Sequence, residues 1–156
     1  MKIEPIILSI SWLVSFLILV IFIHQKNMQM YLVTFLFTST IAWIYQYFQL
    51  MMGFLEFPGR EFSKATKMSF TLHYIVYPTF AVLFIRSISN LNRERIIIVK
   101  IIIFSILISI FTYAISTFSS LIEYRNWNFF IGVISNIIIL YIVKQFVFWF
   151  KRGLME

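Results

Sequence analysis

The sequence contains no cysteine, and its six acidic residues are all glutamates, with no aspartate. Without cysteine the chain has no disulfide, no thiolate nucleophile and no cysteine-ligated metal. Glycine and proline are scarce, with four and three residues, so the paired broken helices that mark many transporters are missing. There is no glycine-rich phosphate loop, no H-E-x-x-H motif and no recognisable Ser/His/Asp arrangement. We therefore expect neither a metal nor a cofactor.

Charged residues are scarce as well, at 12% of 156 residues, whereas 61% are hydrophobic and 20% aromatic. Soluble domains are about 45–50% apolar and about 25% charged, so the composition excludes an ordinary soluble domain. Runs of Ile, Leu, Phe and Val reach the roughly 18 residues that a helix needs to cross the hydrocarbon core. The sequence therefore predicts an all-α integral membrane helical bundle, a single transmembrane domain over residues 1–156.

Five apolar segments separated by short polar stretches predict five transmembrane helices. The predicted spans are 5–23, 30–55, 68–85, 97–122 and 129–150. The first is too long for the apolar part of a cleavable signal peptide, so we interpret it as a retained span. A polar turn is expected at 24–27, a kink in the third span at Pro78, and a cap for the fifth helix at Asn126 or Asn128.

The formal charge of +7 comes from basic residues that flank the apolar segments, which favours membrane orientation over nucleic-acid binding. With five spans, five of the 13 Lys and Arg residues fall on the side of the N-terminus and the other eight on the side of the C-terminus. The positive-inside rule then predicts a multi-pass membrane protein with its N-terminus outside and its C-terminus cytoplasmic. The basic face is expected to attract anionic lipid headgroups, at about 1 kcal/mol per Lys or Arg.

Small and hydroxyl residues mark helix packing in lipid, because apolar side chains do not drive helices together there. Segment 97–122 carries such residues at spacings of three and four, which puts them on one face, followed by Glu123. They are Ser105, Ser109, Thr112, Ser116 and Ser119. We favour a close-packed seam for this stripe. The alternative is a polar wall that lines a cavity ending at Glu123.

Polar groups of the other spans also gather toward the external side, next to the polar island Phe54–Lys67. Span 30–55 has a polar stripe of its own, consisting of Thr34, Thr38, Tyr45, Gln49 and, just beyond it, Glu56. We hypothesise that the folded helices surround one outward-facing polar hollow. Its predicted binding residues are Glu56, Arg60, His73, Tyr77, Glu123, Trp127 and Asn136.

Some of these residues have plainer structural interpretations. Glu56 and Arg60 are four residues apart and can form an exposed ion pair worth a few tenths of a kcal/mol. A lone histidine in a span, such as His73, is more often a hydrogen-bonding packing residue than a ligand. Two carboxylates with one histidine can also bind a divalent cation or carry protons, but no paired acidic motif supports that hypothesis.

The C-terminal half resembles a family of small, uncharacterised multi-span membrane proteins from spore-forming Gram-positive bacteria. The resemblance covers residues 71–143 and rests on scattered positions: Tyr77-Pro78, Arg93, Arg95, Glu123-Tyr124, Asn126-Trp127-Asn128 and Asn136. Asn126 stands where that family commonly has a glycine before the tryptophan. The resemblance implies a bacterial plasma membrane and a bundle of four or five helices, and it implies no reaction.

The leading functional hypothesis is a non-enzymatic binding or accessory protein for a lipid, a peptide, a partner membrane protein or a second copy of the chain. One alternative is a small transporter or ion-conducting oligomer that uses Glu56 or Glu123 as its proton or cation site. A further alternative is a membrane-embedded enzyme acting on lipids, with His73 and a glutamate as acid and base.

Overall fold

The computed structural model describes residues 4–23, 27–62, 64–91 and 93–153. Within these residues the elements follow in the order α1 (Glu4–Phe22), α2 (Met28–Met51), β1 (Leu55–Glu56), the π-helical turn η2 (Leu72–Val76), α3 (Tyr77–Ile88), α4 (Glu94–Phe118), β2 (Glu123–Tyr124) and α5 (Phe129–Gly153). The predicted all-α class is confirmed. The polar turn expected at 24–27 lies, apart from Asn27, outside the described residues.

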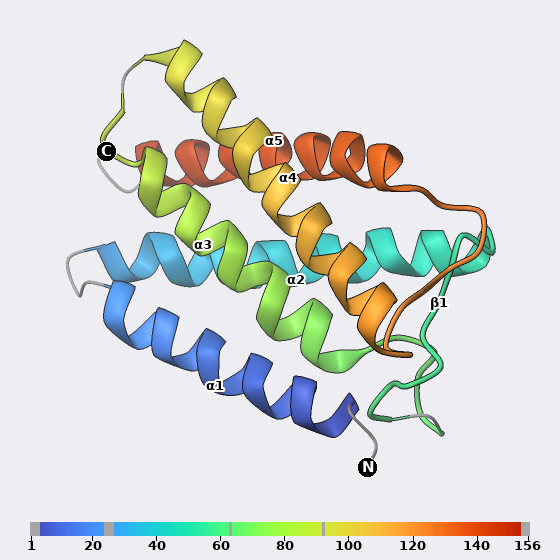
Figure 1. Ribbon diagram of the computed structural model, residues 1–156. Coiled ribbons are helices and arrows are strands. Elements are labelled where there is room, and N and C mark those ends of the chain that lie inside the picture. The colour runs from blue at the N-terminus through green and yellow to red at the C-terminus, as the bar shows by residue number, and fades with distance from the viewer. Residues whose placement is uncertain (1–3, 24–26, 63, 92, 154–156) are drawn as a thin grey trace.

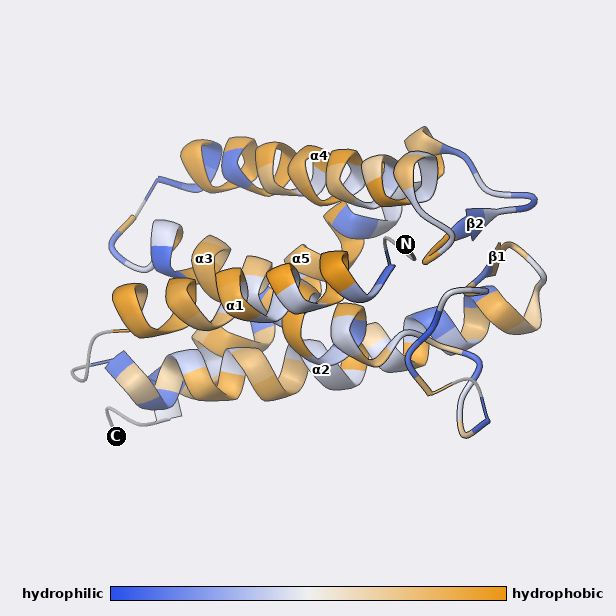
Figure 2. Ribbon diagram, turned by 60° about the horizontal axis from the view of Figure 1, so that its bottom comes forward, coloured by the Kyte–Doolittle hydropathy of each residue, from blue (hydrophilic) through white to orange (hydrophobic). Residues whose placement is uncertain are grey.

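The helices alternate in direction, so their connections gather at two ends of the bundle (Figure 1). One end carries the start of α1, the connection between α2 and α3, and the connection between α4 and α5. The other end carries the end of α1, the start of α2, the end of α3, the start of α4 and the end of α5. Figure 2 shows that hydrophobic residues cover most of the helices, whereas the connections and β2 are largely hydrophilic. This distribution matches the alternation expected from the sequence.

Four helices, α1, α2, α4 and α5, are long and apolar enough to cross a membrane. The predicted third span, 68–85, is different: η2 of 5 residues continues into α3 of 12 residues, and together they form a shorter apolar helix. Pro78 lies in the first turn of α3, directly after the π turn and near the middle of the continuous helix Leu72–Ile88. Its missing N–H costs little there, because the wide π turn already interrupts the regular ladder just before it.

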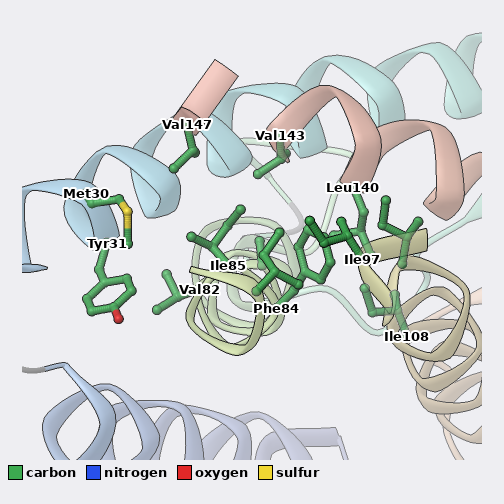
Figure 3. Packing of buried hydrophobic residues seen from close by; sticks show 13 residues of the cluster. Met30, Tyr31, Val82, Phe84, Ile85, Ile97, Ile108, Leu140, Val143 and Val147 are labelled. Atoms are coloured by element: carbon green, nitrogen blue, oxygen red, sulfur yellow. The ribbon is translucent and has the colours of Figure 1, made fainter. Parts of the chain in front are cut away.

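This short helix is the centre of the bundle, since α3 contacts α1, α2, α4 and α5. Phe84 and Ile85 of α3 are fully buried. Figure 3 shows their side chains among residues of the surrounding helices, including Val143 of α5 and Ile97 of α4. Close packing of this kind holds helices together in lipid, where hydrophobic burial alone provides no net attraction.

The outer surface is apolar and the interior contains polar groups. On α1, Leu13, Phe16 and Ile21 are each more than 60% exposed, and Ser15 is the buried residue of that helix. Thr34 and Gln49 of α2, by contrast, are almost completely buried. Such an apolar exterior would be unfavourable in water and suits contact with lipid chains, which indicates a membrane protein.

Most helix ends differ from the predicted spans by one to four residues. Helix α2 ends at Met51 instead of residue 55, and Gly53, with φ +67°, terminates it. The Phe54 N–H donates to the Gln49 carbonyl at 2.9 Å and the Gly53 N–H to the Leu50 carbonyl at 3.0 Å, a pair of bonds known as a Schellman motif.

Helix α4 covers Glu94–Phe118 instead of 97–122, so its predicted last turn is irregular. Helix α5 begins at Phe129 as predicted. The Asn128 side chain accepts a hydrogen bond from the Ile131 N–H at 2.9 Å, which identifies Asn128 as the cap and excludes the alternative, Asn126.

We predict that Gly53→Ala destabilises the protein by about 1 kcal/mol, because a side chain disfavours positive φ. The matched control is Gly153→Ala, at a position with open space and without positive φ. Unfolding of the detergent-solubilised protein by dodecyl sulfate measures both variants. Equal losses in the two variants would contradict this account of the α2 terminus.

Candidate functional site

Two short strands join the ends of α2 and α4 in a clip that the sequence did not predict. Strand β1 pairs antiparallel with β2, with Leu55 opposite Tyr124 and Glu56 opposite Glu123. The Arg125 N–H extends the ladder by donating to the Phe54 carbonyl at 3.0 Å. We call this segment pair the β1–β2 clip. It fixes the chain just beyond the ends of both helices.

A cavity lies between α2, α4 and α5, and residues of the β1–β2 clip form part of its wall. It offers about 60 Å³ to the centres of water molecules. A cavity needs at least about 10–15 Å³ of occupied volume to hold one water, so a small polar group fits. The polar side chains that line the cavity are Thr38, Tyr45, Gln46, Gln49, Tyr77, Thr112, Tyr124, Trp127 and Asn136.

Helix α2 supplies one long wall of the cavity. Its five cavity-lining residues share one helix face, because each lies one, three or four positions from the next. They are Thr38, Ala42, Tyr45, Gln46 and Gln49. At 1.5 Å per residue, this face extends for about 16 Å from the middle of α2 toward its C-terminal end. The cavity therefore reaches from the β1–β2 clip to about half the depth of the bundle.

Three of these α2 residues carry buried oxygen atoms without a hydrogen-bond partner. They are Thr38 Oγ1, Gln46 Oε1 and Gln49 Oε1, in side chains that are at most 7% exposed. A buried polar group without a partner costs about 1–3 kcal/mol. Three of the six such atoms among the described residues belong to side chains that line this cavity, and the other three, on His73, Arg86 and Ser105, do not. The three at the cavity favour it as the place for an additional polar molecule, either water or a ligand.

Other polar groups at the cavity are held by hydrogen bonds. Gln49 Nε2 donates to the Tyr45 hydroxyl at 3.2 Å, and the Tyr124 hydroxyl donates to Thr112 Oγ1 at 3.2 Å. None of the described residues that line the cavity is charged. The site is therefore a neutral one, with amide, hydroxyl and aromatic groups.

Three of the predicted binding residues, Tyr77, Trp127 and Asn136, line this cavity. Asn136 also donates to Ser109 Oγ of α4 at 3.0 Å. Ser109 and the fully buried Ser105 belong to the predicted stripe. Ser105 and Ser109 therefore fit the interpretation of the stripe as a close-packed seam between helices. Thr112 fits the alternative, in which the stripe lines a cavity.

Two predicted residues, Glu56 and Glu123, lie outside the cavity on the exposed face of the β1–β2 clip. Both carboxylates pair with Arg125, at 2.9 Å and 3.3 Å. The hydrogen bond that Arg125 donates to Glu56, and then the charges of both carboxylates, raise the pKa of Arg125. The helices end before reaching these glutamates, so neither points into the bundle from a helix face.

The other two predicted residues, Arg60 and His73, also lie apart from the cavity lining. Arg60 donates to the carbonyls of Thr66 and Phe57, at 2.6 Å and 2.9 Å, and so shapes the loop after β1. His73 is buried, contacts the Ser69 carbonyl through Nδ1, and lies edge-on to the Phe57 ring. Only three of the seven predicted residues therefore line this cavity, and the binding roles of all seven stay predictions.

Sequence reasoning missed Gln46 and Tyr124 as cavity residues. The signal for Gln46 was present, because it lies eight residues after Thr38 and three before Gln49, on the same helix face. Tyr124 gave no such signal. Its position follows from the pairing of β1 with β2, which brings together segments far apart in the chain.

The loop between β1 and η2 is anchored by Glu61, whose carboxylate accepts hydrogen bonds at the start of the third helical segment. The donors are the Thr71 N–H at 2.9 Å, the Phe70 N–H at 3.0 Å and the Ser69 hydroxyl at 3.2 Å. Partial burial alone would raise the pKa of Glu61, but the bonds from Thr71 and Phe70 outweigh it and hold the pKa below 4.5.

The fold and the cavity together define an all-α bundle with four apolar helices of membrane-spanning length and a neutral polar site between three of them. Comparison with protein-family models, with characterised proteins and with solved structures finds no match for this chain.

We predict an acid-sensitive contribution of Glu61 to stability. A carboxyl with a lower pKa in the folded than in the unfolded protein stabilises fully above about pH 4.5, and this stabilisation is lost as pH falls through the folded-state pKa. Melting temperatures between pH 6 and pH 3.5 should therefore fall more steeply for the wild type than for Glu61→Gln. The control Glu56→Gln, which alters an exposed ion pair, should keep the wild-type slope. A wild-type slope in Glu61→Gln would refute the assignment.

Proposed function

We propose that this protein is a non-enzymatic binding or accessory protein of the bacterial plasma membrane, and that all five helices cross the bilayer. Its ligand occupies the cavity between α2, α4 and α5, next to the β1–β2 clip. The observation that carries this proposal is the set of three buried oxygens without partners on Thr38, Gln46 and Gln49. A bound molecule with hydrogen-bond donors would satisfy them.

The charge distribution supports an outward-facing site. Arg93, Arg95, Lys151 and Arg152 belong to the end of the bundle opposite the β1–β2 clip. A basic end favours the cytoplasmic face and its anionic lipid headgroups. In this orientation the N-terminus and the clip are outside, and the cavity is near the outer leaflet.

The chemistry of the cavity favours binding over the two alternatives. A neutral lining gives no compensation for an ion that leaves water, which is costly in a low-dielectric site. Glu56 and Glu123, proposed as the ion site of a transporter, pair with Arg125 at the surface. His73, proposed as the base of an enzyme, is buried against the Phe57 ring and outside the cavity lining.

The kind of partner stays open between a lipid, a peptide, another membrane protein and a second copy of the chain. The cavity supports a small molecule or a lipid headgroup most directly, because about 60 Å³ holds only a small group. Kinship with small membrane proteins of spore-forming bacteria remains a proposal that rests on scattered residues of the C-terminal half.

Access to the cavity can be measured with a single introduced cysteine, because the chain has none of its own. Ala42 lines the cavity, whereas Ala81 is buried in the core and does not. We predict that Ala42→Cys in proteoliposomes reacts with methyl methanethiosulfonate at least about tenfold faster than Ala81→Cys, since the reagent enters a wet cavity but not a packed core. Intact-mass spectrometry follows both reactions. Equal rates would mean that the cavity is closed or dry.

Filling the cavity should abolish binding. Gly132 lines it, and a Cβ there would lie 3.6 Å from Trp127 Nε1 and 3.7 Å from Ser109 Oγ. We predict that the wild type, purified in mild detergent, retains a non-protein mass in native mass spectrometry and that Gly132→Phe loses it. The control Gly153→Phe, in open space at the far end of α5, should retain it. The same masses in all three proteins, or none in the wild type, would contradict the proposed function.

A further inference from the structure

We infer that the ligand of the cavity is a small uncharged group with several hydroxyls, of the size of a triol such as glycerol. This inference rests on the proposed function and adds the chemical class of the ligand. The same chemistry occurs in a free polyol and in the headgroup of a neutral glycerolipid. The experiments below distinguish these two sources.

The first argument is charge. Asp, Glu, Lys, Arg and His are all absent from the described residues that line the cavity. An ion would leave water without gaining a counter-charge, which costs far more than moving a neutral hydroxyl group. Phosphate, carboxylate and ammonium groups are therefore disfavoured as the buried part of the ligand.

The second argument is the hydrogen-bonding capacity of the two glutamines. An amide side chain presents a donor on one side and an acceptor on the other, and either face can be turned toward a ligand. Gln49 Nε2 donates to the Tyr45 hydroxyl, so the other polar atom of this amide, Oε1, has no partner. One polar atom of the amide stays available for a ligand even if the amide is flipped. A hydroxyl both donates and accepts, so it satisfies Gln46, Gln49 and Thr38 whichever way the amides are turned.

The third argument is the alternation of polar and aromatic groups. Four aromatic residues from four different segments line the cavity: Tyr45, Tyr77, Tyr124 and Trp127. Their rings supply apolar surface beside polar tips. A polyol matches this lining, because its C–H groups can pack against the aromatic rings. Its hydroxyls can form hydrogen bonds with the amide and hydroxyl side chains.

Size also limits the ligand. The 60 Å³ available to water centres suits a small polar group. A triol has three carbons and three hydroxyls, whereas a hexose is about twice as large. Three unpartnered oxygens, on Thr38, Gln46 and Gln49, match three hydroxyl groups.

The test uses the Ala42→Cys protein in phosphatidylcholine nanodiscs and measures how added probes slow its labelling. The probes are glycerol, 1-monooleoylglycerol as a neutral glycerolipid, and phosphatidic acid as an anionic lipid. We expect protection by glycerol, by 1-monooleoylglycerol, or by both, and none by phosphatidic acid. Protection by glycerol alone identifies a soluble polyol, and protection by the monoacylglycerol alone identifies a lipid headgroup.

Second-site variants connect this protection to the residues that carry the inference. Gln46→Leu, Gln49→Leu and Thr38→Val should each raise the concentration needed for half-maximal protection by about fivefold, the effect of losing one hydrogen bond. Gln145→Leu is the matched control, because Gln145 is an exposed glutamine of α5 outside the cavity lining. Melting temperatures show that each variant is folded, and Thr38→Val provides a test if a glutamine variant fails to fold.

The inference is overturned if neither glycerol nor 1-monooleoylglycerol slows the labelling of the Ala42→Cys protein. It is also overturned if phosphatidic acid slows the labelling most, or if the cavity variants behave like Gln145→Leu. Occupation of the cavity by water alone would give the first of these results. The proposed function is tested separately by the mass that Gly132→Phe loses. If that mass is lost but no polyol protects, the cavity binds another kind of ligand, and only the inference made here is wrong.

Discussion

Hydrogen bonding without water is the constraint on which this structure depends. Inside a bilayer each polar group needs a partner from the protein itself. The bundle meets this need where helices touch: Lys144 of α5 bonds to Glu94 of α4 at 2.9 Å, and Trp12 of α1 donates to Thr71 at 2.8 Å. Around the cavity the need is met only in part, because Thr38 Oγ1, Gln46 Oε1 and Gln49 Oε1 are buried there without a partner.

The β1–β2 clip follows from the same constraint. Helices α2 and α4 both end before the residues that close the cavity, and the backbone groups beyond them need new partners. Pairing β1 with β2 provides these partners, and the Gly59 N–H adds a bond to the Ser120 carbonyl at 2.8 Å. As a result Leu55 and Tyr124 form a wall of the cavity, while Glu56 and Glu123 face outward.

Much of the fold was predictable, because a helix that crosses a bilayer needs about 20 predominantly apolar residues. Apolar length located α1, α2, α4 and α5, and turn chemistry limited the cap of α5 to Asn126 or Asn128, of which the structure shows Asn128. The third segment was harder. Its helix is short and buried by all the other helices, and a buried helix differs from a lipid-facing one in its neighbours, not in its hydrophobicity. The glycine that ends α2, Gly53, was visible in the sequence, but its positive φ was not.

The sequence by itself determined the class of protein, the number of helices and the polar faces that carry Thr38, Gln49, Tyr77 and Asn136, because helical periodicity is a local property. Only the tertiary structure decided which of those faces meet. The rotation of each helix about its axis decides its contacts, and the pattern of one helix alone does not specify that rotation. The β1–β2 pairing joins residues nearly 70 positions apart, 55 with 124. The cavity exists because of those two choices, and a one-dimensional pattern records neither.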